Sequence, residues 1–246
     1  TAFSGLASDV EIELRLASID PNGNPTNGIT RTSTTTTGFS WTADDVKNSS
    51  SGGQNAWDSR NYLNIWVCNI TKPFAVLGYS QYPFDFSSSP NTDGVVIDFK
   101  NFGRDGSAIS PYNKGRTATH EIGHWLNLFH IWGDDDDNNK MCTLNECNGT
   151  DHVDDTPNQG ERNFGCPSFP RTDCCTPSGN GVMFMNYMDY TKNKCMNLFT
   201  LGQKARMRSL FESGGVRESI KISGQLMFAE ISGSSTICDQ AEYEIP

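Results

Sequence analysis

Three of the four histidines in this 246-residue chain lie within eleven residues, at positions 120, 124 and 130. Residues at i and i+4 share one face of a helix, so the imidazoles of His120 and His124 can reach the same metal ion. Histidines at this spacing are typical ligands of Zn²⁺. With His130 as a third ligand, the fourth position stays open for water, as in catalytic rather than structural zinc sites.

Glu121 directly follows the first of these histidines. Its carboxylate can hold a water beside the metal and accept a proton from it without being a ligand itself. Zinc lowers the pKa of such a water to about 7. The motif therefore predicts metal-assisted hydrolysis with Glu121 as general base. The alternative is a chance match on an ordinary amphipathic helix, and the third histidine counts against it.

His130 follows His124 by six residues. In a continuous helix that step would turn its side chain away from the metal by about 240°. The helix must therefore end, and the chain must bend back through a left-handed residue. Glycine is usual at such a bend, and asparagine is the next-best residue, so we expect Asn127 to form it.

Hydrophobic periodicity indicates the elements that position these residues. A helix over Thr117–Asn127 would place apolar residues opposite the histidines. A second helix is expected from Thr200 to Gly214, opened by a capping box of Thr200 and Gln203. No periodicity is evident from 133 to 181. The expected strands are residues 10–17, Tyr62–Ile70 in a central position, Ala75–Tyr79 and Gly94–Phe99.

Composition narrows the class of protein. The net charge of −10 and pI near 4.8 argue against nucleic acid and anionic membranes as main partners. No apolar run reaches the length of a membrane span, so no membrane insertion is expected. The length fits one large domain with an appendage. We expect a catalytic domain over 1–222, with an N-terminal subdomain to about 130 and a C-terminal subdomain over 131–222. Residues 223–246 would be an extension or the start of a following β domain.

Eight cysteines indicate an oxidising compartment, and five of them fall between residues 142 and 175. Because no Cys-x-x-Cys pair occurs, disulfides are favoured over zinc binding by these thiolates. The chain begins with Thr1, and we interpret it as the mature or trimmed form of a secreted protein.

Over most of residues 10–215, the sequence resembles the pappalysin family of the metzincin zinc endopeptidases. The zinc-binding part of the resemblance is Gly115-Arg-Thr-Ala-Thr-His-Glu-Ile-Gly-His124. The other matching segments are Asp20-Pro21 to Gly28-Ile29, Tyr62-Leu-Asn-Ile-Trp-Val, Gly78-Tyr-Ser-Gln-Tyr-Pro83, Gly94-Val-Val-Ile-Asp98, Asp151-His-Val-Asp-Asp-Thr-Pro157 and Asn186-Tyr-Met-Asp-Tyr190.

The resemblance implies an α+β, zincin-like fold. A twisted mixed sheet with two long helices, one of them carrying the active site, would lie above an irregular, disulfide-stapled C-terminal subdomain. An extended cleft would separate the two halves. The sheet edge beside the cleft would pair with substrate as an added strand, and Ala75–Tyr79 is the candidate. An ordinary edge strand is the alternative.

The resemblance also implies roles for single residues. Met188 would form the tight turn beneath the zinc, where its role is packing. Tyr190 would help to stabilise the oxyanion. Lys194 stands where Arg/Lys-directed relatives carry an acidic residue in the pocket for the residue after the cut bond. A preference for acidic residues there is therefore expected, unless Lys194 points to solvent.

A calcium site and the disulfides are likewise implied by the resemblance. Hard oxygen ligands would come from Asp151, the Val153 carbonyl and Thr156. The implied disulfides are Cys166–Cys195, Cys147–Cys175 (or Cys147–Cys174), and Cys142 with the remaining member of the 174/175 pair.

We therefore predict a secreted, monomeric zinc endopeptidase that cleaves peptide or protein substrates. The alternative is a catalytically weak protein-binding or adhesion module on the same scaffold. Asn127 and the β-like tail from residue 223 motivate that alternative. Turnover separates the two, because both would bind zinc.

Overall fold

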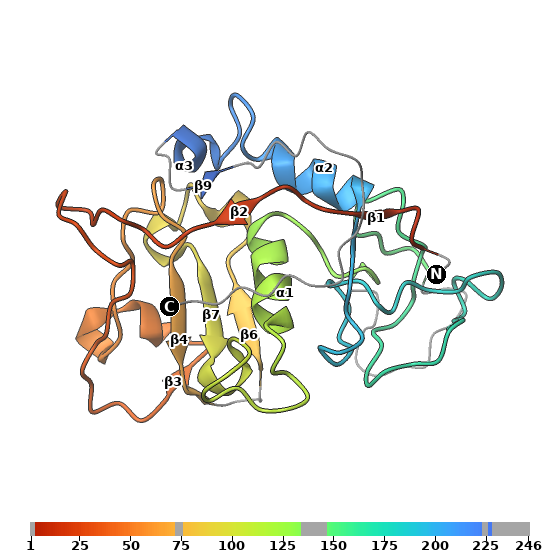
Figure 1. Ribbon diagram of the computed structural model, residues 1–246, viewed down its shortest axis with the longest axis horizontal. Coiled ribbons are helices and arrows are strands. Elements are labelled where there is room, and N and C mark those ends of the chain that lie inside the picture. The colour runs from red at the N-terminus through yellow and green to blue at the C-terminus, as the bar shows by residue number, and fades with distance from the viewer. Residues whose placement is uncertain (1–2, 72–75, 134–146, 223–225, 228–246) are drawn as a thin grey trace.

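The structure is a computed structural model that describes residues 3–71, 76–133, 147–222 and 226–227. It has a half built on a small sheet and a half built almost entirely of loops, with the helix α1 (Arg116–Trp125) on the sheet side (Figure 1). This mixed α+β architecture with an irregular, disulfide-containing C-terminal half confirms the expected fold class.

The largest sheet has the strand order β4-β7-β6. Its central strand, β7 (Val95–Asp98), runs parallel to β4 (Ile65–Cys68) and antiparallel to β6 (Gly78–Ser80). All four residues of β7 are buried, as its apolar run predicts for a strand covered on both faces. Helix α1 packs against β6 and β7, so the histidines are carried on the helix next to the edge strand β6.

The expectation that residues 62–70 form a central strand is wrong. Among the described strands β4 pairs only with β7, and Ile65 and Val67 are 39% and 44% exposed. The chain then leaves this sheet, because β5 (Ile70–Thr71) pairs with β3 (Phe39–Ser40) instead. The apolar run over residues 62–70 therefore contains strand β4 and the start of strand β5, which pair with different strands. Its composition does not show where one strand ends and the other begins.

The expected strand over residues 10–17 is also largely wrong. Only β2 (Glu13–Leu14) is extended and paired, and Leu14 and Leu16 are exposed. Glu11 has a φ of 55°, which interrupts the extended backbone before β2. β1 (Ala7–Ser8) pairs with β8 (Phe199–Thr200), and β2 pairs with β9 (Leu226–Met227). In Figure 1 the N-terminal segment runs across both halves, below α2 and α3 in that view.

Helix α2 (Leu201–Ser209) begins with the predicted capping box between Thr200 and Gln203. It is shorter than the expected helix to Gly214, and a turn leads on to α3 (Glu218–Ile222). With 10 residues in α1 and 9 in α2, the two long helices that the resemblance implied are absent from the described residues. The main core lies between α1, α2 and the loop-rich half, and its fully buried side chains include Trp125, Leu128, Met183, Met188 and Phe211.

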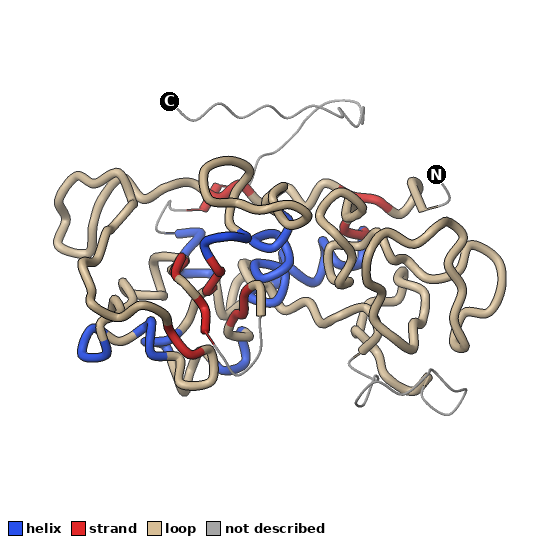
Figure 2. Tube along the Cα trace, turned by 90° about the horizontal axis from the view of Figure 1, so that it is seen from below, coloured by secondary structure: helices blue, strands red, loops and turns tan. Residues whose placement is uncertain are grey.

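Residues 147–198 contain no helix or strand, and Figure 2 shows this half as continuous loop. Within the described ranges, the disulfides Cys147–Cys175 and Cys166–Cys195 hold it together. Cys174 is also disulfide-bonded, and the expected pairing of Cys142 lies outside the described residues. Sulfurs that are paired in this way are not available as zinc ligands.

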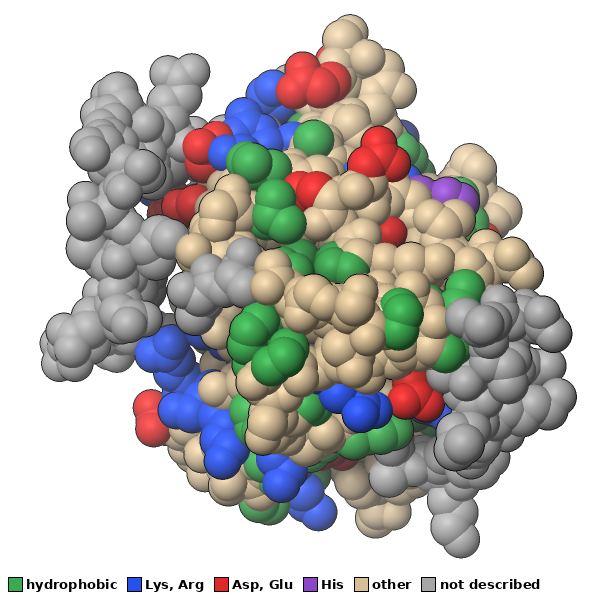
Figure 3. All heavy atoms as spheres, turned by 90° about the vertical axis from the view of Figure 1, so that its right-hand side faces the viewer, with side chains coloured by type: hydrophobic (Ala, Val, Ile, Leu, Met, Phe, Trp, Pro, Cys, Tyr) green, Lys and Arg blue, Asp and Glu red, His purple; other side chains and the backbone are tan. Residues whose placement is uncertain are grey.

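Figure 3 looks onto the loop-rich half. Hydrophobic side chains are scattered among polar ones there, and Lys and Arg side chains gather along the lower edge.

Cys68, on β4, is a free thiol, and burial raises its pKa to about 12, so it stays protonated and unreactive. None of the helices in the described ranges has the length and apolarity needed to span a membrane.

Candidate active site

The bend after α1 brings His130 back to the two helical histidines. The helix ends at Trp125, and Asn127 has a φ of 71°, in the left-handed region. The N–H of Leu128 then donates to the Gly123 carbonyl at 2.9 Å. Arg206 of α2 donates through Nε to the Asn127 carbonyl at 2.5 Å, which ties the bend to a second helix. A residue with a side chain is therefore accommodated where glycine is usual.

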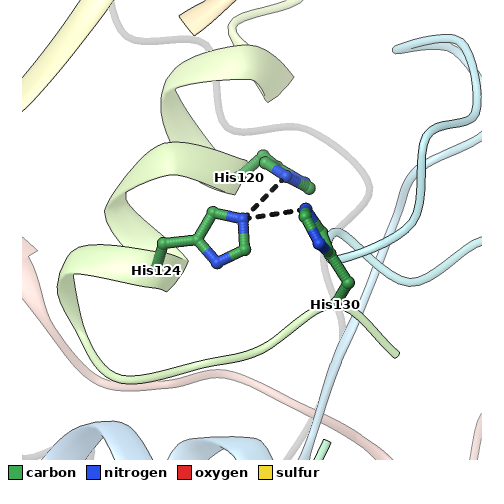
Figure 4. A group of neighbouring side chains, drawn as sticks. All are labelled: His120, His124 and His130. Atoms are coloured by element: carbon green, nitrogen blue, oxygen red, sulfur yellow. Dashed lines mark hydrogen bonds between the residues drawn. The ribbon is translucent and has the colours of Figure 1, made fainter. Parts of the chain in front are cut away.

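The three histidines point their Nε2 atoms at one another (Figure 4). The Nε2 of His124 lies 3.1 Å from that of His120 and 3.1 Å from that of His130. On the far side of the rings, His120 Nδ1 is 2.7 Å from the Tyr187 carbonyl, and His124 Nδ1 is 2.7 Å from the Leu128 carbonyl. Carbonyl partners place the proton on Nδ1, so the lone pair on Nε2 faces inward.

This arrangement fits a metal ion. Burial and the neighbouring His120 and His130 lower the pKa of His124 well below its usual value, which keeps its imidazole neutral. Neutral imidazole is the form that binds metal. Three nitrogens from one side, with no fourth protein ligand among the described residues, are the donor set expected for catalytic zinc.

Glu121 is buried beside this cluster, and burial raises its pKa to about 8. The edge strand β6 passes directly over it. A Cβ added to Gly78 would lie 2.8 Å from Glu121 Cγ and 3.1 Å from its Oε1. The space that Glu121 occupies therefore depends on the missing side chain at Gly78, a requirement that no sequence motif indicated.

Met188 is fully buried. It meets α1 at Gly123, where an added Cβ would lie 2.5 Å from the Met188 sulfur. Its backbone N–H donates to Asn186 Oδ1 at 2.9 Å, and its carbonyl accepts from Ile131 at 3.4 Å. These contacts pack the sulfur of Met188 against α1 at Gly123, which lies between His120 and His124 in sequence.

Tyr190 stands on the other side of the cluster. Its ring centroid is 4.9 Å from that of His130 and 5.7 Å from that of His120. Asp189 links the Tyr190 segment to Asn163. Its buried carboxylate accepts the Tyr190 N–H at 2.7 Å and the Asn163 N–H at 2.8 Å. Burial raises the pKa of Asp189 to about 6. Asp189 is a supporting residue that sequence reasoning missed.

Tyr82 was also missed, although it lies in one of the matching segments. Its hydroxyl is 3.0 Å from His124 Nδ1, and its ring stacks on Phe129 with centroids 5.2 Å apart. Phe129 in turn lies under the Arg206 guanidinium, 5.2 Å from its ring centroid. One aromatic face of the site is therefore built from residues that come together only in the fold, since Tyr82 and Arg206 lie far from the histidine motif in sequence.

The three residues expected to bind calcium lie together in a loop. Thr156 Oγ1 is 2.8 Å from Asp151 Oδ2 and 2.8 Å from the Val153 carbonyl. Asp151 is buried, and burial raises its pKa to about 6. Lys194 is exposed, between the disulfide-bonded Cys195 and the buried Asn193.

Comparison with known proteins places this geometry in context. The model of the pregnancy-associated plasma protein-A peptidase family matches residues 33–212. Mature mirolysin of Tannerella forsythia, solved in complex with a cleaved peptide, is 60% identical with a TM-score of 0.85; the match covers 92% of this chain and 80% of that one. Mirolysin in complex with compound 9 is 61% identical with a TM-score of 0.84, over 90% of this chain and 79% of that one.

An extracellular metalloprotease of Pyricularia oryzae is 37% identical over 151 residues, which make up 61% of this chain and 48% of that protein. A similarly named protein of Colletotrichum graminicola gives the same identity and covers 48% of its own length. The chain thus spans about half the length of these curated relatives.

Proposed function

The chain belongs to the pregnancy-associated plasma protein-A family of peptidases, and on that premise we propose that it is a zinc-dependent endopeptidase that acts outside the cell on peptides and proteins. The observation that carries the proposal is the convergence of three Nε2 atoms beside the buried Glu121. The names of the extracellular relatives and the disulfide-rich C-terminal half support the compartment.

The residues present fit catalysis of peptide-bond hydrolysis. Zinc bound by His120, His124 and His130 supplies Lewis-acid chemistry, lowering the pKa of water and polarising a carbonyl. Glu121 accepts a proton from the water whose oxygen attacks the carbonyl carbon, and returns it to the leaving amine as the C–N bond breaks. The Tyr190 hydroxyl donates a hydrogen bond to the developing oxyanion. Gly78 and Asp189 keep Glu121 and Tyr190 in place.

Two features suggested the alternative of a binding module with weak catalysis: Asn127 and the tail from residue 223. The first no longer supports it. Asn127 adopts the left-handed conformation that the bend requires, and Arg206 holds its carbonyl. The tail from residue 223 lies outside the described residues except for β9. The histidines and Glu121 are arranged as hydrolysis requires, so the peptidase is the function we propose.

We further propose that Lys194 selects acidic residues after the cut bond. Its neighbours fix its position: Asn193 accepts the N–H groups of Lys114 and Arg116, at 3.0 and 3.3 Å, and Cys195 is held by its disulfide. The exposed ammonium of Lys194 is then presented from a fixed backbone, close in sequence to Tyr190. A carboxylate in the substrate would be its natural partner.

Cleavage of a diverse peptide library by the zinc-loaded chain tests both proposals. Cleavage should stop in the presence of a chelator and resume when zinc is restored. Asp and Glu should be enriched after the cut bond, and Lys194→Glu should shift that enrichment to Lys and Arg. Lys192→Glu, an equal charge change on a nearby exposed lysine, should leave the profile unaltered. Basic enrichment with the unmodified chain would show that Lys194 does not line the pocket.

We propose a calcium site at Asp151, the Val153 carbonyl and Thr156, because these oxygens already gather around the Thr156 hydroxyl. With zinc held saturating, calcium at about 100-fold its dissociation constant should raise the Tm by roughly 5–10 °C. Thermal unfolding measured with and without calcium checks this. Asp151→Asn should remove the calcium-dependent rise, whereas Asp154→Asn, an exposed neighbour, should retain it. A Tm insensitive to calcium would rule the site out.

A further inference from the structure

Three aromatic rings form a continuous stack that begins at a zinc ligand and ends in solvent. The Tyr82 hydroxyl lies 3.0 Å from His124 Nδ1. The ring of Tyr82 stacks on Phe129 on one side, with centroids 5.2 Å apart and planes at 24°. On the other it stacks on Phe84, with centroids 5.0 Å apart and planes at 11°. We call Phe84, Tyr82 and Phe129 the aromatic stack.

The stack is held rigidly at its inner end and is open at its outer end. Phe129 is fixed by the Arg206 guanidinium above its ring and by the edge of the exposed His152 ring, 5.4 Å away. Phe84, in contrast, is 63% exposed. A large apolar ring left in water beside a catalytic centre costs free energy, which a ligand covering it would recover.

The stack and Tyr190 contact different histidines of the cluster. Tyr82 contacts His124, with ring centroids 5.3 Å apart, whereas Tyr190 lies against His130 and His120. A peptide that crosses the cluster passes Tyr190 on one side of its cut bond and Tyr82 on the other. Tyr82 also follows the edge strand β6 by only two residues, so a chain lying along β6 reaches the stack.

We propose that the aromatic stack is the wall of a subsite that selects an apolar side chain, aromatic or leucine-like, in a residue before the cut bond. This inference rests on the proposed peptidase function and names part of its substrate class. The open face of Phe84 offers the contact, because offset stacking and burial both favour an apolar partner over a polar one. Phe129 and Arg206 hold the stack in place, and Phe84 makes the contact with substrate.

Profiling of the same peptide library with Phe84→Ala tests the proposal. The unmodified chain should enrich Phe, Tyr, Leu or Met at one position before the cut bond. Phe84→Ala should reduce kcat/KM by about three- to tenfold for peptides with Phe at that position. Peptides with Gly there should be cleaved at an unchanged rate, and the profile after the cut bond should stay the same. Because Phe84 is largely exposed, the variant is expected to fold normally.

Phe102→Ala is the matched control, since Phe102 is also exposed, at 39%, and makes none of the ring contacts that hold the aromatic stack in the described residues. It should leave every position of the profile unchanged. An identical profile for Phe84→Ala and the unmodified chain would overturn the inference while leaving the peptidase intact, as would a change confined to positions after the cut bond. A zinc-loaded, folded chain that cleaves nothing would defeat the proposed function itself, and this inference with it.

Discussion

Replacing Glu121 with glutamine or alanine is expected to lower kcat by about 10²- to 10⁴-fold, because the water then loses the group that accepts its proton. Zinc should stay bound, since the three nitrogens that converge belong to His120, His124 and His130. Glutamine keeps the shape of the buried side chain and its fit beneath Gly78 but cannot accept a proton as a carboxylate does. The measurements are kcat on a cleaved peptide and the zinc content of the same sample.

Glu212→Gln supplies the matched control, because it makes the same chemical change on an exposed residue in the turn that follows α2. Its kcat and zinc content should equal those of the unmodified chain. If Glu121→Gln lost its zinc, Glu121 would be acting as a ligand or as a support for the ligands, and the role assigned to it would be wrong. Full activity in Glu121→Gln would place the general base elsewhere.

The histidine cluster could be predicted from sequence because its spacing has a direct geometric meaning. One helical turn separates His120 from His124, and a bend is the only way for His130 to reach the same point. The identity of Asn127 indicated where that bend lies, and its φ of 71° shows the backbone that the argument required. The capping box of α2 was predictable for the same reason, since it depends on two residues three positions apart.

The surroundings of the cluster could not be predicted in the same way. Gly78 faces Glu121, Arg206 binds the Asn127 carbonyl, and Tyr82 touches His124, each across a large separation in sequence. None belongs to a local pattern, because these contacts are created by the packing of strand β6 against α1 and by the contact of α2 with the bend after α1. The wrong prediction of a strand over residues 10–17 has a related cause. The alternation of apolar and polar residues there does not reveal the positive φ at Glu11 that interrupts the extended backbone.

Arg217 is another residue whose contacts no local sequence pattern predicts, and these contacts bear on the stability of the fold. It lies beyond the residues that match the family model, directly before α3. In the structure it is fully buried, and its guanidinium binds both oxygens of the buried Asp93 at 2.6 and 2.7 Å. Its charged group also lies 3.9 Å from the ring centroid of Trp125, the last residue of α1. The segment after α2 is therefore tied to the end of the helix that carries the histidines.

Arg217→Met is expected to reduce the free energy of unfolding by about 3–5 kcal/mol, because it removes the guanidinium that binds both oxygens of the buried Asp93 carboxylate. Methionine fills much of the same volume, so the loss should come mainly from the unpaired charge. The free energy of unfolding is measured by urea unfolding with the disulfides intact and zinc at a saturating concentration. Arg60→Met, which removes a similar ion pair with Asp58 from the surface, should cause little change.

The double variant Arg217→Met with Asp93→Asn distinguishes a buried ion pair from simple packing. Asparagine keeps a hydrogen-bond acceptor for the Trp125 indole, which donates to Asp93 at 3.0 Å, but carries no charge. The double variant should therefore be more stable than Arg217→Met alone, since no unpaired charge remains buried. Additive losses would instead mean that Arg217 acts through its contacts with Trp125 and Phe86, and that the ion pair itself contributes little.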